Sequence, residues 1–381
     1  MKKSLIAAAL LGTFAASAFA APSVTLYGRI DTSLAYTHEH NAVSVDADKN
    51  VSVSSFDQAS MESGFSTSNR WGLKGTEDIG NAKVGFVLES GFNSDDGASG
   101  QGGRLFGREA QVNVSGAYGT LYAGRLGSIV SDFGSLGYLG DVSAFPAAFG
   151  FVGTQAGSTG SAYARYDNTL AYQTPVFSGL QAAAMYSFKG DTLSSNDSLK
   201  NARENSSFAD RYAAAGLRYN AGKAAVVLAG DLSLYGNKAT TVDNGYSVIL
   251  GGNYDFGVAK VFAKATYFDN QTSPVDSFGL FNFAKKIEGV KALKGWGAEL
   301  STAVPAFGGT VIAGVSYRDA EEVQGDNEYK RWEAALGYTY AFSKRTNAYA
   351  GVTYAQQKAE MKDKNQTPSA VGVMAGLVHK F

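Results

Sequence analysis

The sequence contains no cysteine among its 381 residues, which excludes disulfide scaffolds and thiolate metal sites. Charge is scarce: charged residues make up 18%, and 33 Lys+Arg against 34 Asp+Glu leave no basic field for nucleic acid. Only six prolines occur, and the five after Pro22 all fall where we expect loops or turns. After Ala21 no apolar run approaches 18 residues, which excludes transmembrane helices. What is abundant is Gly (46) together with Tyr (21) and Phe (23), a composition that disfavours disorder.

The first twenty residues are predicted to be a signal peptide. Residues 1–3 are a short basic start, 5–14 are a short apolar run, and a small-residue cleavage signal ends at Ala20. The apolar run is shorter than the roughly 20 residues of a membrane-spanning helix, which disfavours the alternative of an N-terminal anchor. We therefore expect a mature chain of residues 21–381. Loss of the two lysines leaves 31 basic and 34 acidic side chains, a formal charge of -3.

Strict alternation of apolar and polar residues recurs along the chain. In 331–342, Trp332 and Leu336 share one face while Arg331 and Glu333 share the other, and the segments 246–256, 310–318 and 371–377 repeat this pattern. A period of two indicates β-strands with one apolar face. The runs exceed the roughly 5–6 residues of soluble strands and match the roughly 9–11 residues of a transmembrane strand. They favour membrane strands over a soluble sandwich or solenoid.

Short turns alternate with long polar connections. The turns include 78–81, 117–119, 174–179, 220–222, 255–257, 304–309 and 342–345. The long connections include 38–62, 190–207, 271–292 and 358–368, and 271–292 has room for a further hairpin. Short turns at one rim and long loops at the other are typical of membrane barrels. The sequence thus predicts an all-β fold, a transmembrane antiparallel β-barrel of about 16 strands.

Six motifs carry a resemblance to a known family. They are Val-Thr-Leu-Tyr-Gly-Arg at 24–29, Arg-Trp-Gly-Leu-Lys-Gly-Thr-Glu-Asp-Ile-Gly at 70–80, Gly-Arg-Leu-Phe-Gly-Arg at 103–108, Gly-Thr-Leu-Tyr-Ala-Gly-Arg at 119–125, Arg-Tyr-Asp-Asn-Thr at 165–169 and Leu-Val-His-Lys-Phe at 377–381. With these motifs in this order, the chain resembles the Gram-negative general porins, particularly the type common in β-proteobacteria.

The resemblance implies a channel of the outer membrane for passive diffusion of ions and small hydrophilic solutes. It implies a homotrimer with one water-filled pore per subunit, embedded among lipid and lipopolysaccharide. It further implies that the third long loop, about 126–164, folds into the pore, and that the terminal Phe381 is an assembly signal read by the barrel-assembly machinery. Neither a catalytic centre nor a cofactor or metal is expected.

The functional site implied by the resemblance is a charged constriction. Basic wall residues carry over onto Arg29, Arg70, Lys74, Arg108 and Arg165, and the loop supplies Asp132 and Asp141. Alternation also places Arg29, Arg70 and Lys74 inward. Arg108 shares parity with Val112, so alternation alone places it outside. Arg125 is a candidate for the pore mouth, with its facing left open.

Five basic against two acidic residues predict mild anion preference, although the acidic loop motif common in the family is not recognisable here. Three other functions remain open on the sequence. They are a substrate-specific channel for sugars or organic acids, an outer-membrane lipase or protease, and a secreted adhesin. The enzyme is disfavoured because His38, His40 and His379 are poorly placed for a catalytic constellation.

Overall fold

The computed structural model describes residues 23–45, 51–146, 164–194, 197–236, 243–272, 292–361 and 364–381. The predicted signal peptide lies outside these residues. Most of the described chain is β-strand. The strands are β1 (Ser23–Val45), β2 (Val51–Ser63), β3 (Arg70–Asp78), β4 (Lys83–Gly91), β5 (Glu109–Gly116), β6 (Gly119–Gly127), β7 (Arg165–Gln173), β8 (Leu180–Ser187), β9 (Arg211–Ala221), β10 (Ala224–Leu234), β11 (Gly245–Asp255), β12 (Lys260–Gln271), β13 (Leu293–Ala306), β14 (Gly309–Glu322), β15 (Glu328–Ala341), β16 (Thr346–Met361), β17 (Lys364–Gln366) and β18 (Ser369–Lys380). Three short helices complete it: η1 (Gln101–Gly103), η2 (Leu139–Asp141) and α3 (Asp197–Asn201).

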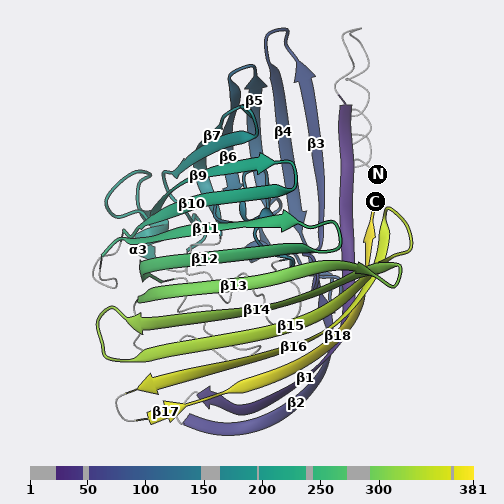
Figure 1. Cartoon of the computed structure of the whole chain (residues 1–381). Coiled ribbons are helices and arrows are strands. Elements are labelled where there is room, and N and C mark those ends of the chain that lie inside the picture. Colours follow the sequence, from purple (N-terminus) through teal and green to yellow (C-terminus); the bar gives the residue numbers. More distant parts are fainter. Residues whose placement is uncertain are drawn as a thin grey trace, which may run out of the picture.

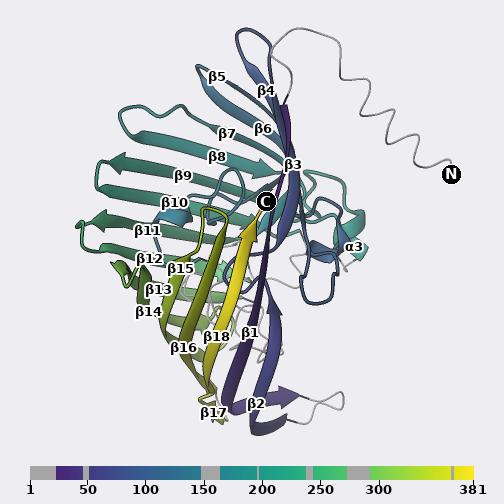
Figure 2. The same cartoon turned by 90° about the vertical axis from the view of Figure 1, so that its right-hand side faces the viewer.

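The strands close into a ring because the long first strand, β1, pairs both with β3 and with the last strand of the chain. Residues 23–29 of β1 pair with β3, and residues 29–40 pair with the last strand, β18. From β3 to β16 each strand pairs with the next, and β16 pairs with β18. Figures 1 and 2 show β18 lying beside β1. Within the described residues, β1, β3–β16 and β18 make a closed antiparallel barrel of sixteen strands, which confirms the predicted fold.

The predicted loop 38–62 is wrong in its extent. β1 continues to Val45 and β2 begins at Val51, so the two form a hairpin whose register runs from Thr32 opposite Ser63 to Val45 opposite Val51. β2 and β3 pair with the same edge of β1, one after the other, and the residues 64–69 between them leave the strand. Alternation missed this because the polar residues there occupy both faces of an extended hairpin. The start of the predicted connection 358–368 is likewise strand, since β16 runs to Met361.

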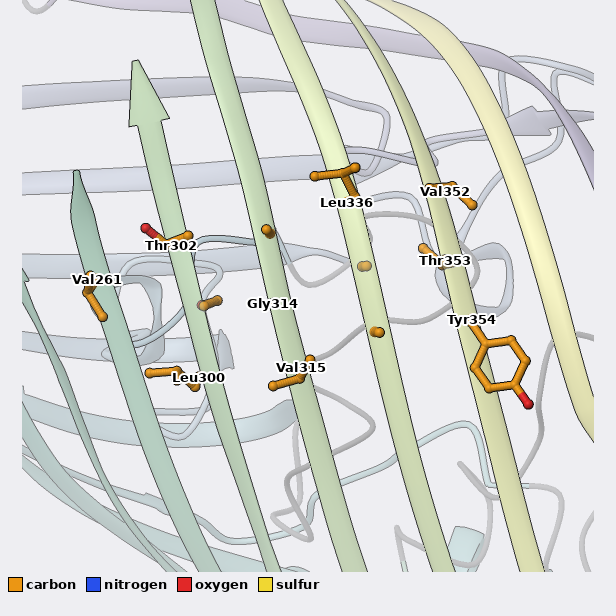
Figure 3. Close-up of a pocket in the computed structure, with 13 residues that line it drawn as sticks. Val261, Leu300, Thr302, Gly314, Val315, Leu336, Val352, Thr353 and Tyr354 are labelled. Carbon is orange, nitrogen blue, oxygen red and sulfur yellow. The ribbon is translucent and has the colours of Figure 1, made fainter. Parts of the chain in front are cut away.

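The outer face of the wall is apolar and exposed. On β10, Val226 and Leu228 are 47% and 45% exposed, whereas Val227 between them is fully buried. A shallow depression of about 690 Å³ lies on the outer face of β12–β16. Its lining includes the exposed residues Leu300, Val315 and Leu336, which Figure 3 labels. A barrel whose outward side chains are apolar is built to face lipid. Among the described residues, no helix is long and apolar enough to cross a membrane.

Tight turns close one end of the barrel. In the β13–β14 turn, Phe307 and Gly308 both have positive φ (53° and 77°), the conformation of a two-residue hairpin turn that matches strand twist. Residues 79–82, 117–118, 222–223 and 256–259 form similar short links, as predicted. Pro305 departs from the expectation for prolines, because it lies within β13 opposite Thr310. The long connections 92–108, 128–164 and 188–210 all lie at the opposite end.

Candidate functional site: an arginine-lined cavity

Four arginines converge on the inner side of β1–β7. Arg29 on β1 lies directly opposite Arg70 on β3, Arg108 precedes β5, and Arg165 begins β7. We call these four residues the arginine wall. All four line one cavity of about 1140 Å³. The structure therefore brings together four of the five basic residues that the family resemblance placed on the pore wall.

One carboxylate neutralises part of the arginine wall. Glu89 on β4 accepts a hydrogen bond from Arg108 Nε at 2.7 Å and lies 3.6 Å from Arg70 NH1. Its other oxygen accepts the Tyr27 hydroxyl at 3.0 Å. Arg29 donates to the hydroxyl of Thr67 at 2.8 Å. Within the described residues, Arg29 and Arg165 form no ion pair, so the wall keeps an excess of positive charge.

Arg108 faces inward although strand alternation predicts the opposite. It is 3% exposed, and its neighbour Glu109 is 4% exposed. β5 begins only at Glu109, so Arg108 still belongs to the preceding connection and does not obey the alternation of the strand. The inward placement implied by the family resemblance is the one observed.

The remaining lining shows that this cavity lies at the short-turn end of the barrel. Gly308 and Ser343 come from the tight turns, and Lys344 and Lys380 add two basic side chains. Among the described lining residues, Asp132 is the only acidic one. With the arginine wall, the lining thus holds six basic residues and one acidic residue. We call it the short-turn cavity.

The connection after β6 packs against the buried face of the wall. Its described part, 128–146, contributes Ile129, Leu136, Tyr138, Leu139 and Val142 to an apolar cluster with buried residues of β6–β11. The ring of Phe133 lies under the Arg165 guanidinium, 3.9 Å from ring centre to Cζ, which is a cation–π contact.

Polar bonds hold the far end of this connection to other strands. The Ser143 hydroxyl donates to Glu299 on β13, and the Ala144 N–H donates to the Ser301 hydroxyl at 3.0 Å. The Asp141 carbonyl accepts the Asn253 side-chain amide at 2.8 Å, and the Asp141 carboxylate lies 4.0 Å from Arg218 NH1. The segment 128–146 therefore reaches from the arginine wall to β13.

A second cavity, of about 490 Å³, lies toward the long connections. Arg104, Arg125, Asp191, Asp210 and Arg165 are among its lining residues. Arg165 lines both cavities, so the two meet at this side chain. We call the second one the long-loop cavity.

Asp167 organises the arginines of the long-loop cavity. One of its oxygens bonds Arg125 NH1, and the other lies 3.0 Å from Arg104 NH2. Arg104 also bonds Asp191 at 2.7 Å, and Arg125 Nε donates to the Gly107 carbonyl at 2.8 Å. Burial alone lowers the pKa of Arg104, but the two aspartates outweigh it and hold this pKa above its ordinary value.

Asp210 lines the same cavity, but no arginine bonds its carboxylate in the described part of the chain. Burial raises the pKa of its carboxyl above the ordinary value, and the hydrogen bond from the Gly236 N–H, at 2.7 Å, opposes that rise only in part. The nearby charge of Asp191 raises the pKa further.

Comparisons with known proteins agree with this architecture. A family model described as Gram-negative porin matches residues 7–360. The chain belongs to this family. An outer membrane porin protein of Bordetella pertussis is 38% identical over the whole of both chains. Outer membrane porin protein 32 of Delftia acidovorans is 31% identical, over 94% of this chain and 90% of that one. The protein is therefore a channel-forming porin of the Gram-negative outer membrane.

Solved structures share the fold of this porin. The anion-selective porin from Comamonas acidovorans matches 94% of this chain and 100% of its own, with a TM-score of 0.61 and 24% identity. The trimer form of OmpT from Vibrio cholerae matches with a TM-score of 0.61 and 16% identity, over 94% of this chain and 99% of its own.

Not every residue predicted for the porin's site joins the arginine wall. Lys74 lies outside the lining of the short-turn cavity, and its ammonium sits 5.2 Å from the centre of the Tyr27 ring. Asp132 lines that cavity, whereas Asp141 is anchored near Arg218. Arg125 lies on the long-loop cavity.

Phe381 lies at the seam that closes the barrel. It exchanges two backbone hydrogen bonds of 3.1 Å with Gly28. A Cβ added to Gly28 would stand 2.3 Å from the Phe381 ring, so glycine lets the ring cover the first strand. The last residue therefore packs on the seam of the barrel.

Sequence reasoning missed Glu89, Lys344 and Lys380. Glu89 alternates with the apolar Phe86 and Leu88, a signal that could have placed it inside with the arginines. Lys344 and Lys380 sit in or next to short turns, where the period of two gives no facing. Their approach to the cavity depends on barrel closure, which brings β18 beside β1.

The predicted histidine pair lies on strand and faces outward. His38 bonds Asp57 at 2.9 Å and His40 bonds Ser55 at 3.0 Å, across the β1–β2 hairpin. His379 bonds Thr346 at 2.9 Å. All three are exposed. In the described part of the chain, no group of three or more His, Asp or Glu side chains is arranged to hold a metal ion.

The opposite side of the porin's interior carries charges of another kind. Lys264 on β12 lies opposite Glu299 on β13, with Nζ 3.0 Å from Oε2 and both side chains at 0% exposure. Arg331 bonds Glu333 on β15, with side chains 5% and 1% exposed. We call these two ion pairs the paired wall.

Proposed function

We propose that this porin passes small hydrophilic solutes and ions by passive diffusion with a preference for anions. The observation that supports the preference is the lining of the short-turn cavity, with six basic residues against Asp132. A pore lined by one sign of charge concentrates ions of the opposite sign. Glu89 offsets part of the positive charge, which accounts for a preference rather than a strict exclusion of cations.

The segment 128–146 is proposed to be the described part of the constriction loop. Its apolar cluster with β6–β11, its stacking of Phe133 on Arg165 and its bonds to Glu299 and Ser301 support this role, because each contact lies on the buried face of the barrel wall. Residues 147–163, the rest of the predicted loop, lie outside the described residues. Asp132 would face the arginine wall and set a transverse field across the narrow part.

The other parts of the proposal concern export and assembly. Residues 1–20 direct export, and residues 21–381 make the barrel. By analogy with the trimer form of OmpT, we propose a homotrimer in lipid and lipopolysaccharide, with the short turns facing the periplasm. Phe381, at the last strand, is proposed as the signal for the barrel-assembly machinery. A channel selective for one class of solute is the second candidate, and the long-loop cavity favours it.

The test is a reversal potential in planar bilayers under a KCl gradient. The wild-type porin is expected to give a potential of the sign set by chloride, with conductance rising in steps of three. An Arg70→Gln/Arg165→Gln variant should lower the anion-to-cation permeability ratio, since two lining charges are lost. Lys223→Gln, at an exposed short turn outside both cavities, is the matched control. A reversal potential that shows cation preference in the wild type would contradict the proposal.

A further inference from the structure

The long-loop cavity holds a preorganised pair of guanidinium groups. Asp167 bonds Arg125 with one oxygen and Arg104 with the other, and its second oxygen also accepts the Thr192 hydroxyl at 2.7 Å and the Thr192 N–H at 2.9 Å. With this many donors, Asp167 is saturated and cannot serve a solute. Asp167 instead positions the two arginines beside the cavity.

The charge of this cluster remains positive. Four arginines line the cavity, and three carboxylates, those of Asp167, Asp191 and Asp210, balance three of them, which leaves an excess of one positive charge; the four are Arg104, Arg125, Arg165 and Arg211. Arg125 is further fixed by its bond to the Gly107 carbonyl, so its guanidinium cannot swing away. A fixed, planar guanidinium with free N–H groups is the side chain best suited to bind a carboxylate with two parallel hydrogen bonds.

An acceptor lies on the same cavity. Asp210 uses Oδ1 for the Gly236 N–H, and Oδ2 has no bond to a described residue. The hydroxyl groups of Ser233 and Tyr235 also belong to the lining, but each donates to the protein, to Gln271 at 3.4 Å and to the Asn270 carbonyl at 3.1 Å. The cavity thus offers guanidinium donors and, besides the Asp191 carboxylate that bonds Arg104, a free oxygen of Asp210.

We propose that the long-loop cavity is a binding site for small carboxylic acids that carry a hydrogen-bond donor beside the carboxylate, that is, amino acids or hydroxy acids. Arg104 and Arg125 hold the carboxylate, and Asp210 accepts the amine or hydroxyl group. The site lies before Arg165, so a solute is captured there and then passes the side chain that both cavities share. The inference rests on the proposed function, because it assigns the site a place on the route through the channel.

Three probes of the same carbon number test this site: propionate, lactate and alanine. Each is added on the long-loop side of a bilayer that conducts KCl, and its half-blocking concentration is measured by current-noise analysis. We expect lactate or alanine to block at a concentration at least fivefold below that of propionate. If only lactate blocks better than propionate, the preferred donor is a hydroxyl group; if only alanine does, the preferred donor is an amine.

Two variants separate the parts of the site. Asp210→Asn keeps the acceptor for Gly236 and should abolish the advantage of the donor-bearing acid while leaving propionate unchanged. Arg125→Gln should raise the half-blocking concentration of every probe by about tenfold, as expected for loss of a charge-assisted hydrogen bond. Because that variant leaves Asp167 with one arginine fewer, Arg125→Lys is tested beside it and should recover part of the block.

Equal half-blocking concentrations for the three probes in the wild type overturn the proposal. So does a block that survives Arg125→Gln but disappears in Arg70→Gln, because the solute then binds only at the arginine wall. KCl selectivity without a probe is measured first in each variant. Loss of anion preference there counts against the proposed function, whereas the order of the probes reports on this site alone.

Discussion

The two sides of the barrel interior carry similar side chains in opposite situations. On the arginine wall, four guanidinium groups face a cavity of about 1140 Å³, and only those of Arg70 and Arg108 contact the carboxylate of Glu89. On the paired wall, Lys264 and Glu299 meet at 3.0 Å with no exposed side-chain surface, and Arg331 bonds Glu333. Basic charge is in excess along the cavity, whereas Lys264 and Arg331 on the paired wall each have a buried carboxylate partner.

The difference follows from the cost of burying charge. An ion taken out of water is stable only when a partner of opposite sign and good geometry compensates the lost hydration. The arginine wall faces a cavity of about 1140 Å³ that has room for water, so its partly exposed members Arg29, Arg70 and Arg165 keep hydration, while the buried Arg108 bonds Glu89. The segment 128–146 links the two sides, since Phe133 stacks on Arg165 while Ser143 bonds Glu299. One end of the segment is therefore bonded to a carboxylate that is already paired with Lys264, and the other end lies at the charged cavity.

The largest effect is expected from breaking the paired wall. Lys264→Met leaves Glu299 buried without its partner, which should lower the free energy of unfolding by about 3–5 kcal/mol. Arg29→Met, on the arginine wall, loses the bond to Thr67 but no ion pair, and should cost about 1 kcal/mol. Urea-induced unfolding of the detergent-solubilised porin, followed by tryptophan fluorescence, measures both.

The control for this prediction is the double variant Lys264→Met/Glu299→Leu. Replacing both charges with apolar groups removes the uncompensated carboxylate and should recover most of the lost stability. If the double variant is as unstable as the single one, burial of an unpaired charge is not the cause. If Arg29→Met costs as much as Lys264→Met, the distinction between the two sides fails.

A change in ion selectivity, with a smaller effect on stability, is expected from Glu89→Gln. The variant keeps one acceptor oxygen for Arg108, its NH2 group can donate to the Tyr27 hydroxyl, and it removes the negative charge nearest the arginine wall. Anion preference in a KCl gradient should therefore increase. Glu77→Gln, an exposed change on the neighbouring strand β3 with the parity of Trp71, is the control and should leave the potential unchanged. If the reversal potential of Glu89→Gln shifts toward cation preference, or does not shift, Glu89 is not the charge that limits the anion preference of the arginine wall.

These two sides differ in how far the sequence alone reveals them. Alternation predicted that Arg29 faces inward, and Arg29 lines the short-turn cavity; Asp31, two residues further along β1, is fully buried. Arg70 follows from the same rule. The rule fails at Arg108, which precedes its strand, and it does not extend into Lys344, which lies in a turn. Facing can be read from a period of two only inside a strand.

The paired wall could not be predicted at all. Lys264 and Glu299 are apart in sequence, and their contact depends on the register between β12 and β13, in which each is opposite the other. A slip of either strand by one residue would turn its charged side chain to the outer face and break the contact. The Ser143 bond to Glu299 is more remote still, because it joins a connection to a strand seven positions further along the barrel. Composition and alternation give which face a residue occupies, but not which residue it meets there.

The smallest effect is expected where a charge pair lies outside the barrel interior. Lys330 and Glu328 on β15 lie 2.8 Å apart, as close as the Lys264–Glu299 pair, but both are partly exposed. Water screens such a pair, and each side chain remains hydrated when the other is removed. Lys330→Met should therefore leave the urea midpoint unchanged within error, while the same substitution at Lys264 shifts it strongly. Equal shifts at the two sites would show that the distance between charges, rather than their burial, decides the stability of this barrel.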